Sequence, residues 1–148
     1  MTPFDMIKTQ MVHAVPFARH VGIELIDIGD GTATAALEQR PETSNHIKTQ
    51  HAGAMFTLGE AASGGALGGA LAPVLLEVRP VASGAQIRYL KIAKGRLTAT
   101  AQTSQPGADL LATLMAEGKV AFGVDVEIRD ESGDTVVTMT VDWHVKKG

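Results

Sequence analysis

The chain has 148 residues, a formal net charge of −3 and no cysteine. This length suits one domain with a core of its own, and the lack of cysteine excludes a disulfide framework and thiol chemistry. The negative balance provides no basic field for nucleic acid, and residues 1–15 contain no long apolar run after a basic start, so no signal peptide is predicted.

The first part of the chain predicts a helix followed by a hairpin. Thr2 and Pro3 are typical of a helix start, because threonine caps a helix and proline is tolerated at the first helical position. Asp30-Gly31 is a strong hairpin signal. The predicted elements are an amphipathic helix over Pro3–Val12, a short turn over Pro16–His20, and strands over Val21–Ile28 and Thr32–Glu38.

The central stretch, Asn45 to Pro73, is the most unusual part of the sequence. A polar loop from Arg40 to Gln50 is predicted to lead into one long helix from about His51 to Leu71, which Pro73 ends. About 20 residues at roughly 1.5 Å each span the width of a small domain. Because this helix is nearly apolar on all sides, we expect it to be buried all round.

Glycines and a single charge set this helix apart. Each interior glycine costs about 1 kcal/mol relative to alanine, so close approach of other backbones is the expected reason for them. Glu60 is the one charge, and a lone buried carboxylate is costly unless it is paired or its pKa shifts. Glu60 is therefore the residue of this helix whose presence most needs an explanation. The interior glycines are Gly59, Gly64, Gly65, Gly68 and Gly69.

Alternating strand patterns follow Pro73. Short turns between neighbouring strands argue for an antiparallel sheet, and one buried helix requires that sheet to curl around it. We therefore predict one α+β domain over residues 1–148. The predicted elements are strands over Leu75–Val81 (an edge strand, because of Pro80), Ala85–Ile92 and Arg96–Ser104, a short helix or loop over Asp109–Glu117, and strands over Lys119–Arg129 and Thr135–Val145.

Several residues together resemble a known family. Their spacing matches, without a gap from Asn45 through Glu60, the pattern of the PaaI-like (phenylacetate-type) acyl-CoA thioesterases. Ala52 stands where that family usually has glycine, and Glu60 where this branch usually has aspartate. The resemblance covers roughly residues 22–145 and implies the hotdog fold, an antiparallel β-sheet wrapped around one long central helix. The residues that carry it are Asn45, His51-Ala52-Gly53, Glu60 and Tyr89–Gly95.

The residues also indicate how a thioester would be hydrolysed. The first N–H groups of a helix lack intrahelical partners and lie where the helix dipole favours negative charge, so those of Ala52 and Gly53 are candidates for an oxyanion hole. The resemblance points to Ala52 in particular. It also implies that Glu60 is the general base or the nucleophile and that Asn45 holds the attacking water or orients the thioester.

Six further residues are predicted to bind substrate. Among them, His51 is expected to shape the helix start rather than transfer protons. The basic residues, together with Arg96, are expected to meet the phosphates of coenzyme A, although an ordinary solvated strand face is the alternative. The six are His51, Ser63, Arg88, Tyr89, Lys91 and Lys94.

Helix geometry predicts an oligomer. Ala52 and Glu60 are eight residues apart, or about 12 Å along the axis, whereas both would need contacts of about 3 Å with one carbonyl group. If both act, they come from different protomers. The resemblance likewise implies a homodimer or a dimer of dimers.

Each feature also has a simpler interpretation. Glu60 could be a structural carboxylate that is paired with a buried arginine or caps a neighbouring element, and Asn45 could be a loop residue with a left-handed backbone. His46, His51 and Glu60 suggest a metal site, but the last two project from opposite sides of the helix, so no metal is predicted. Ala52–Leu76 is the one candidate membrane span, which the strand-rich remainder of the chain argues against.

The leading hypothesis is an acyl-CoA thioesterase that releases a free acid and coenzyme A. Two alternatives remain: a non-catalytic protein that binds acyl thioesters, and a hotdog dehydratase, which would need a catalytic histidine opposite the acid. The expected partners are the acyl-CoA substrate and further copies of the chain, with no nucleic acid and no membrane. No cofactor is predicted beyond coenzyme A as part of the substrate, and the expected location is cytoplasmic.

Overall fold

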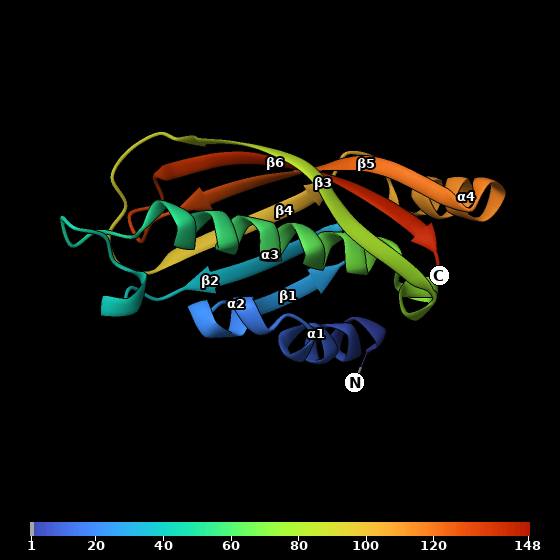
Figure 1. Ribbon diagram of the computed structural model, residues 1–148, viewed down its shortest axis with the longest axis horizontal. Coiled ribbons are helices and arrows are strands. Elements are labelled where there is room, and N and C mark those ends of the chain that lie inside the picture. Colours follow the sequence, from blue (N-terminus) through green and yellow to red (C-terminus); the bar gives the residue numbers. More distant parts are fainter. Residues whose placement is uncertain (1) are drawn as a thin grey trace.

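The computed structural model describes residues 2–148 and contains one antiparallel sheet with a long helix against it (Figure 1). The predicted α+β architecture, a sheet wrapped around one central helix, is confirmed. The elements are α1 (Pro3–Ala14), α2 (Pro16–Val21), β1 (Glu24–Gly29), β2 (Thr32–Leu37), the 3-10 helix η1 (Pro41–Thr43), α3 (Ala52–Ala70), the 3-10 helix η2 (Ala72–Glu77), β3 (Val78–Tyr89), β4 (Leu97–Thr103), α4 (Gly107–Glu117), β5 (Lys119–Arg129) and β6 (Thr135–Lys147).

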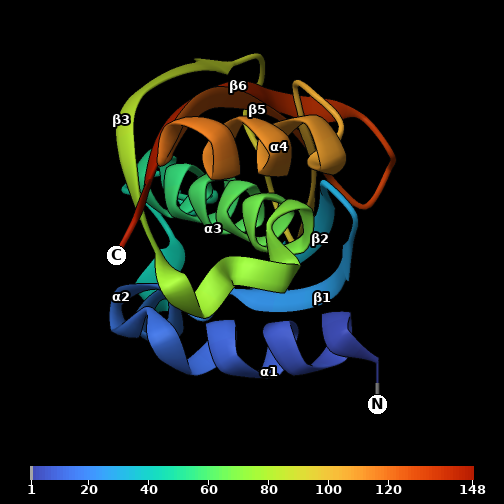
Figure 2. The same cartoon turned by 90° about the vertical axis from the view of Figure 1, so that its right-hand side faces the viewer.

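The six strands are ordered β1-β2-β4-β5-β6-β3. Every neighbouring pair is antiparallel, and the alternating burial of β4, β5 and β6 places one face of each against the core. Figure 2 shows the sheet curling around α3, with α1 on the remaining side and α4 at one end. The core therefore lies between α3 and the concave face of the sheet.

The glycines of α3 allow this close contact between helix and sheet. A Cβ atom at Gly69 would overlap the backbone carbonyl oxygen of Gly29 in β1, and one at Gly65 would lie 2.9 Å from the Cβ of Ala33. A Cβ at Gly59 would collide with the sulfur of Met139. The expected close backbone approach is confirmed at Gly69, and side chains take the space at the other two positions.

The expectation that α3 is buried all round is wrong. Its first turns are open to solvent at Ala52, Gly53 and Phe56, and Glu60 and Gly64 are only partly covered. The sheet curls over one side of α3 and the N-terminal helices reach another, which leaves a strip between α1 and β3 uncovered (Figure 1). Among residues 2–148, no helix combines the length and hydropathy needed to cross a membrane.

The N-terminal helix begins as predicted. Thr2 accepts a hydrogen bond from the N–H of Asp5, and the Asp5 carboxylate accepts one from the N–H of Thr2, which is a capping box. The turn predicted over Pro16–His20 is wrong, because the chain forms the short helix α2 there. Gly22 ends α2 with a φ of 94°, a left-handed backbone that glycine adopts without strain.

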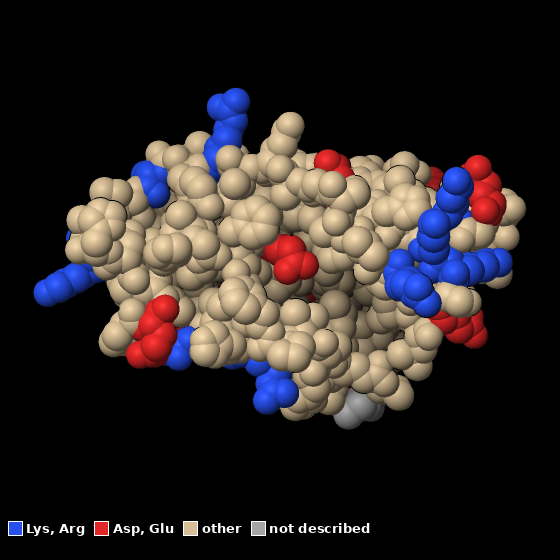
Figure 3. Space-filling view, viewed as in Figure 1, with Lys and Arg blue, Asp and Glu red and all other residues tan. Residues whose placement is uncertain are grey.

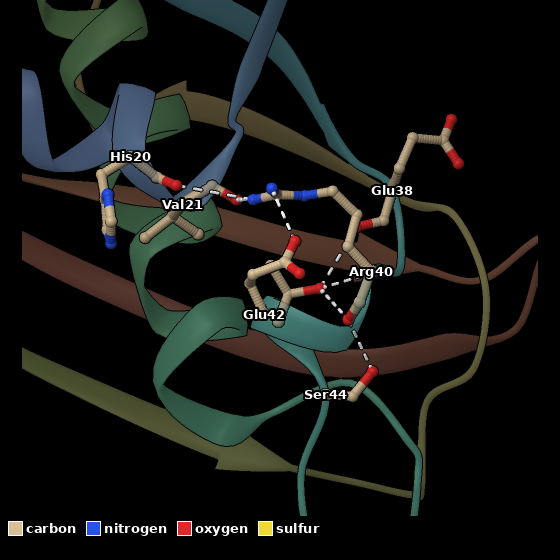
Figure 4. Close-up of polar contacts among 7 residues, drawn as sticks. His20, Val21, Glu38, Arg40, Glu42 and Ser44 are labelled. Atoms are coloured by element: carbon tan, nitrogen blue, oxygen red, sulfur yellow. Dashed lines mark hydrogen bonds and ion pairs between the residues drawn. The ribbon is translucent and has the colours of Figure 1, made fainter.

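Arg40 ties α2 to the loop that precedes α3 (Figure 4). Its guanidinium group donates hydrogen bonds to the carbonyl oxygens of His20 and Val21, and pairs with Glu42 at 3.0 Å. A cation at the last carbonyls of a helix is favourable. The loop and the N-terminal helices are therefore held together through one side chain.

The strand after α3 differs from the prediction. Two separate strands were predicted, over Leu75–Val81 and Ala85–Ile92, but the structure has one continuous strand, β3, from Val78 to Tyr89. The residues before it, Ala72–Glu77, form the 3-10 helix η2. Pro73 stands in the first turn of η2, where its missing N–H costs nothing. The predicted edge position is confirmed, because β3 pairs with β6 alone.

Candidate functional site

The loop that enters α3 is organised by Asn45. Its Oδ1 accepts hydrogen bonds from the N–H groups of Ile47 (3.1 Å) and Thr49 (3.0 Å), and its Nδ2 donates to the Thr49 hydroxyl and the Gln50 carbonyl. These bonds occupy the Asn45 amide within its own loop, as an Asx-type turn does. The left-handed residue of this loop is Lys48, with a φ of 62°, and not Asn45.

His51 caps α3, as the sequence predicts. Its Nδ1 accepts a hydrogen bond of 2.8 Å from the N–H of Gly53, so Gly53 is not a free oxyanion donor and that part of the prediction is wrong. No acceptor among the described residues takes the N–H of Ala52, the first residue of the helix. Ala52 therefore remains as the N–H group at the helix start that is available to a ligand.

A cavity of about 360 Å³, the helix-end cavity, surrounds this N–H group. Asn45, Ala52, Tyr89 and Lys91 are among the residues that line it, so the fold brings together four of the predicted site residues. The Tyr89 hydroxyl donates a hydrogen bond of 3.0 Å to the carbonyl oxygen of Ala52, which ties the end of β3 to the start of α3. The arrangement presents the Ala52 N–H to the cavity as an unused donor, and the helix dipole adds positive potential there.

Glu60 lies elsewhere, in a second cavity of about 380 Å³, the carboxylate cavity. Most of its lining is apolar and comes from α1, α2, α3, η2 and β6. Within residues 2–148, no side chain or N–H group donates to the Glu60 carboxylate, and no cation pairs with it. Figure 3 shows this side of the molecule as a broad uncharged area with acidic atoms near its hollowed centre.

Burial raises the pKa of Glu60 above its ordinary value. The cause is desolvation, since removing a carboxylate from water disfavours its charged form. The paired-arginine interpretation of Glu60 is wrong: Arg19 lines the same cavity but makes no ion pair with it in the described chain. An unpaired carboxylate with a raised pKa in an apolar cavity is typical of a general base.

The remaining predicted residues are dispersed. Ser63 is fully buried, donates to the Glu60 backbone carbonyl and accepts a 3.0 Å hydrogen bond from Trp143 Nε1. Arg88 lies on the outer face of the sheet, in a groove of about 670 Å³, and Lys94 is exposed.

Lys91 and Arg96, the other two basic residues expected to meet phosphates, are neutralised by carboxylates. Lys91 Nζ lies 2.6 Å from Asp134 and 3.5 Å from Asp130, and the hydrogen bond to Asp134 raises the pKa of Lys91. Arg96 pairs with Glu38 and Glu24. Two of the four basic residues expected to meet the phosphates are therefore already paired with carboxylates.

Two features of the carboxylate cavity were not predicted from the sequence. Trp143, which is 8% exposed, forms part of its wall. It is the single tryptophan of the chain, and that was the one signal in the sequence that could have pointed to it. Met11 and Arg19 bring the N-terminal helices into the wall. No local pattern in the sequence indicates that these helices face Glu60.

The antiparallel sheet wrapped around one long central helix defines a hotdog-fold protein. The chain belongs to the family described as a domain of unknown function, DUF4442, whose model matches residues 5–145. No curated protein matches the sequence.

Solved structures agree with this fold. A protein of unknown function from Pseudomonas aeruginosa, described as a probable thioesterase, has a TM-score of 0.80 at 20% identity, with 99% of this chain and 97% of that chain covered. The Escherichia coli PaaI protein of the phenylacetic acid degradation operon has a TM-score of 0.78 at 23% identity, covering 99% and 94%. A protein from Shewanella oneidensis, described as a putative thioesterase, has a TM-score of 0.80 at 15% identity, with 99% of this chain and 98% of that chain covered. The resemblance to PaaI-like proteins is thus confirmed, with the likeness lying in the fold.

Proposed function

We propose that the protein is an acyl-CoA thioesterase, which hydrolyses an acyl thioester to a free acid and coenzyme A. One observation carries the proposal: the unpaired Glu60 carboxylate lies in an apolar cavity that is large enough for an acyl group. The names given to the structurally similar proteins support the same activity.

Glu60 has the properties that the chemistry needs. As a general base it would take a proton from water while the water oxygen attacks the thioester carbonyl carbon. The C–S bond then breaks, the acid is formed, and the proton goes to the departing thiolate. In the alternative route the Glu60 carboxylate attacks the carbonyl carbon itself, the C–S bond breaks and coenzyme A leaves as the thiolate, and water then hydrolyses the anhydride to the acid and the Glu60 carboxylate. A single turnover in ¹⁸O-water identifies the anhydride route if the first product is unlabelled, because water that attacks the Glu60 carbonyl carbon of the anhydride leaves an enzyme oxygen in the acid.

A complete site requires two chains. Ala52 and Glu60 are about 12 Å apart along one helix and line separate cavities. We propose a homodimer in which the Ala52 N–H of one protomer stabilises the oxyanion beside the Glu60 of the other. The open strip of α3 and the free edge of β3 support this arrangement, since an unpaired strand edge is a ready surface for a second chain.

The test is thiol release from a panel of acyl-CoAs with different chains. Glu60→Gln should lower kcat at least about a hundredfold, as expected for a lost base, while Glu117→Gln, at an exposed carboxylate of α4, should leave it unchanged. Below neutral pH the wild-type rate should fall as Glu60 becomes protonated, beginning at a higher pH than for an ordinary glutamate. Wild-type turnover by Glu60→Gln would make Glu60 structural. Tight binding of acyl-CoA without hydrolysis would instead favour the non-catalytic binding protein.

A further inference from the structure

Strand register gathers three basic residues that are far apart in the sequence. Lys146 of β6 pairs directly with Arg79 of β3 on one side and with Lys119 of β5 on the other. Directly paired residues project from the same face of a sheet. Since Val120 and Val145, their neighbours along the strands, are buried in the core, the three basic side chains lie on the outer face. We call Arg79, Lys146 and Lys119 the basic ladder.

The basic ladder is a group of exposed cations. All three residues are exposed, and none of them takes part in an ion pair among the described residues. Like charges directly opposite one another destabilise a sheet, and the chain as a whole carries a net charge of −3. Figure 3 shows lysine and arginine side chains gathered at the end of the molecule where the C-terminus lies, with some acidic side chains beside them. A local excess of positive charge on an acidic protein needs an anion to offset it.

The basic ladder lies at the start of β3, where part of the carboxylate cavity lies on the opposite face of the sheet, because successive side chains of a strand alternate between the two faces. Pro80, the residue after Arg79, lines that cavity together with Leu75 and Leu76 of η2. The next outward-facing rung of the sheet has no carboxylate: it consists of Val81, His144 and Ala121. Val81 is 57% exposed. We call this rung, which holds no lysine, arginine or carboxylate and borders the basic ladder, the uncharged step.

We propose that the basic ladder binds the phosphate groups at the nucleotide end of coenzyme A, with the adenine on the uncharged step. This inference rests on the proposed function, because it assigns the second half of the same substrate. Neighbouring strands are about 4.8 Å apart, so the three cations extend over only about 10 Å. That spacing suits a compact polyanion, to which Lys and Arg bind strongly. An acidic protein would need a far larger contact, of about 800 Å² per partner.

The first measurement needs no catalysis. Adenosine 3′,5′-bisphosphate is titrated into the full-length protein by calorimetry at two salt concentrations. The wild-type protein should bind it, more weakly at high salt, and the double variant K119Q/K146Q should bind about tenfold more weakly, since two charge-assisted contacts are lost. Arg129→Gln, which removes one charge from the opposite end of β5 where Arg129 is paired with Glu127, should bind as the wild type does. No binding by the wild-type protein, or equal binding by K119Q/K146Q, would overturn the inference.

The second measurement compares two substrates that carry the same acyl group. K119Q/K146Q should raise KM for the acyl-CoA about tenfold with kcat unchanged, and should leave KM for the N-acetylcysteamine thioester, which has no phosphates, as it is. Equal effects on both substrates would overturn the inference. If neither thioester is hydrolysed while the bisphosphate binds through the basic ladder, the proposed function fails and the anion site remains.

Discussion

Replacement of Ala52 by proline tests the oxyanion donor with little disturbance of the fold. Ala52 is the first residue of α3, and its N–H makes no hydrogen bond within the described chain. Proline is well suited to this helical position. His51 already has the extended backbone that a residue before proline requires, with φ −70° and ψ 139°. Ala52→Pro therefore removes one N–H group and keeps the carbonyl oxygen that Tyr89 contacts.

The expected effect follows from what is removed. Loss of one preorganised oxyanion donor typically lowers kcat by about 10²–10³. KM should change little, because the N–H stabilises charge that develops only in the transition state. The free energy of unfolding should change by no more than about 1 kcal/mol, since no native hydrogen bond is lost.

The assay is steady-state thiol release together with urea unfolding of the same preparations. Ala52→Gly is the matched control, because it alters the side chain and keeps the N–H; it should retain most of the wild-type kcat. A folded Ala52→Pro protein with the wild-type kcat would refute the donor role. Equal losses in Ala52→Pro and Ala52→Gly would show that the side chain matters and the N–H does not.

Three further predictions follow from the same geometry. Mixing Glu60→Gln with Ala52→Pro should restore about a quarter of the wild-type activity, because half of the randomly mixed dimers would be heterodimers and each heterodimer would hold one intact site of two. Mass measurement checks that the subunits exchange. Demonstrated heterodimers without activity would refute the composite site. Glu60→Gln should be more stable than the wild type at neutral pH, because the raised pKa means that ionised Glu60 destabilises the folded state. In urea unfolding, this difference in stability should shrink as the pH falls through the raised pKa of Glu60 and vanish below the ordinary glutamate pKa. Equal stability of the two proteins at neutral pH would contradict the desolvation argument. Gly69→Ala should be strongly destabilising, because its Cβ would overlap the Gly29 carbonyl. Gly64→Ala should instead raise the unfolding free energy by up to about 1 kcal/mol, because the nearest atom to its Cβ would lie 3.7 Å away. Equal stabilities of the two variants would refute the close approach of α3 and β1 at Gly69.

The sequence by itself determined the centre of the fold, because its signals there are local. His51 caps the helix and Pro73 ends it, and both act within one turn of the chain. Small residues along the helix indicated a close neighbour, as Gly69 confirms. One carboxylate in an apolar helix was conspicuous without any knowledge of its surroundings. The outline of the fold and the prominence of Glu60 could therefore be predicted.

Other features depended on contacts between distant segments, which no local pattern records. The apolar run around Leu75 was predicted as a strand but forms the 3-10 helix η2. The carboxylate cavity exists because α1 and α2 fold back beside α3. The basic ladder arises from antiparallel register alone, which sets Arg79, Lys146 and Lys119 side by side although up to 67 positions separate them. The sequence states which side chains are present. Which of them become neighbours in space depends on the pairing of strands and the burial of apolar faces, and only the tertiary structure shows this.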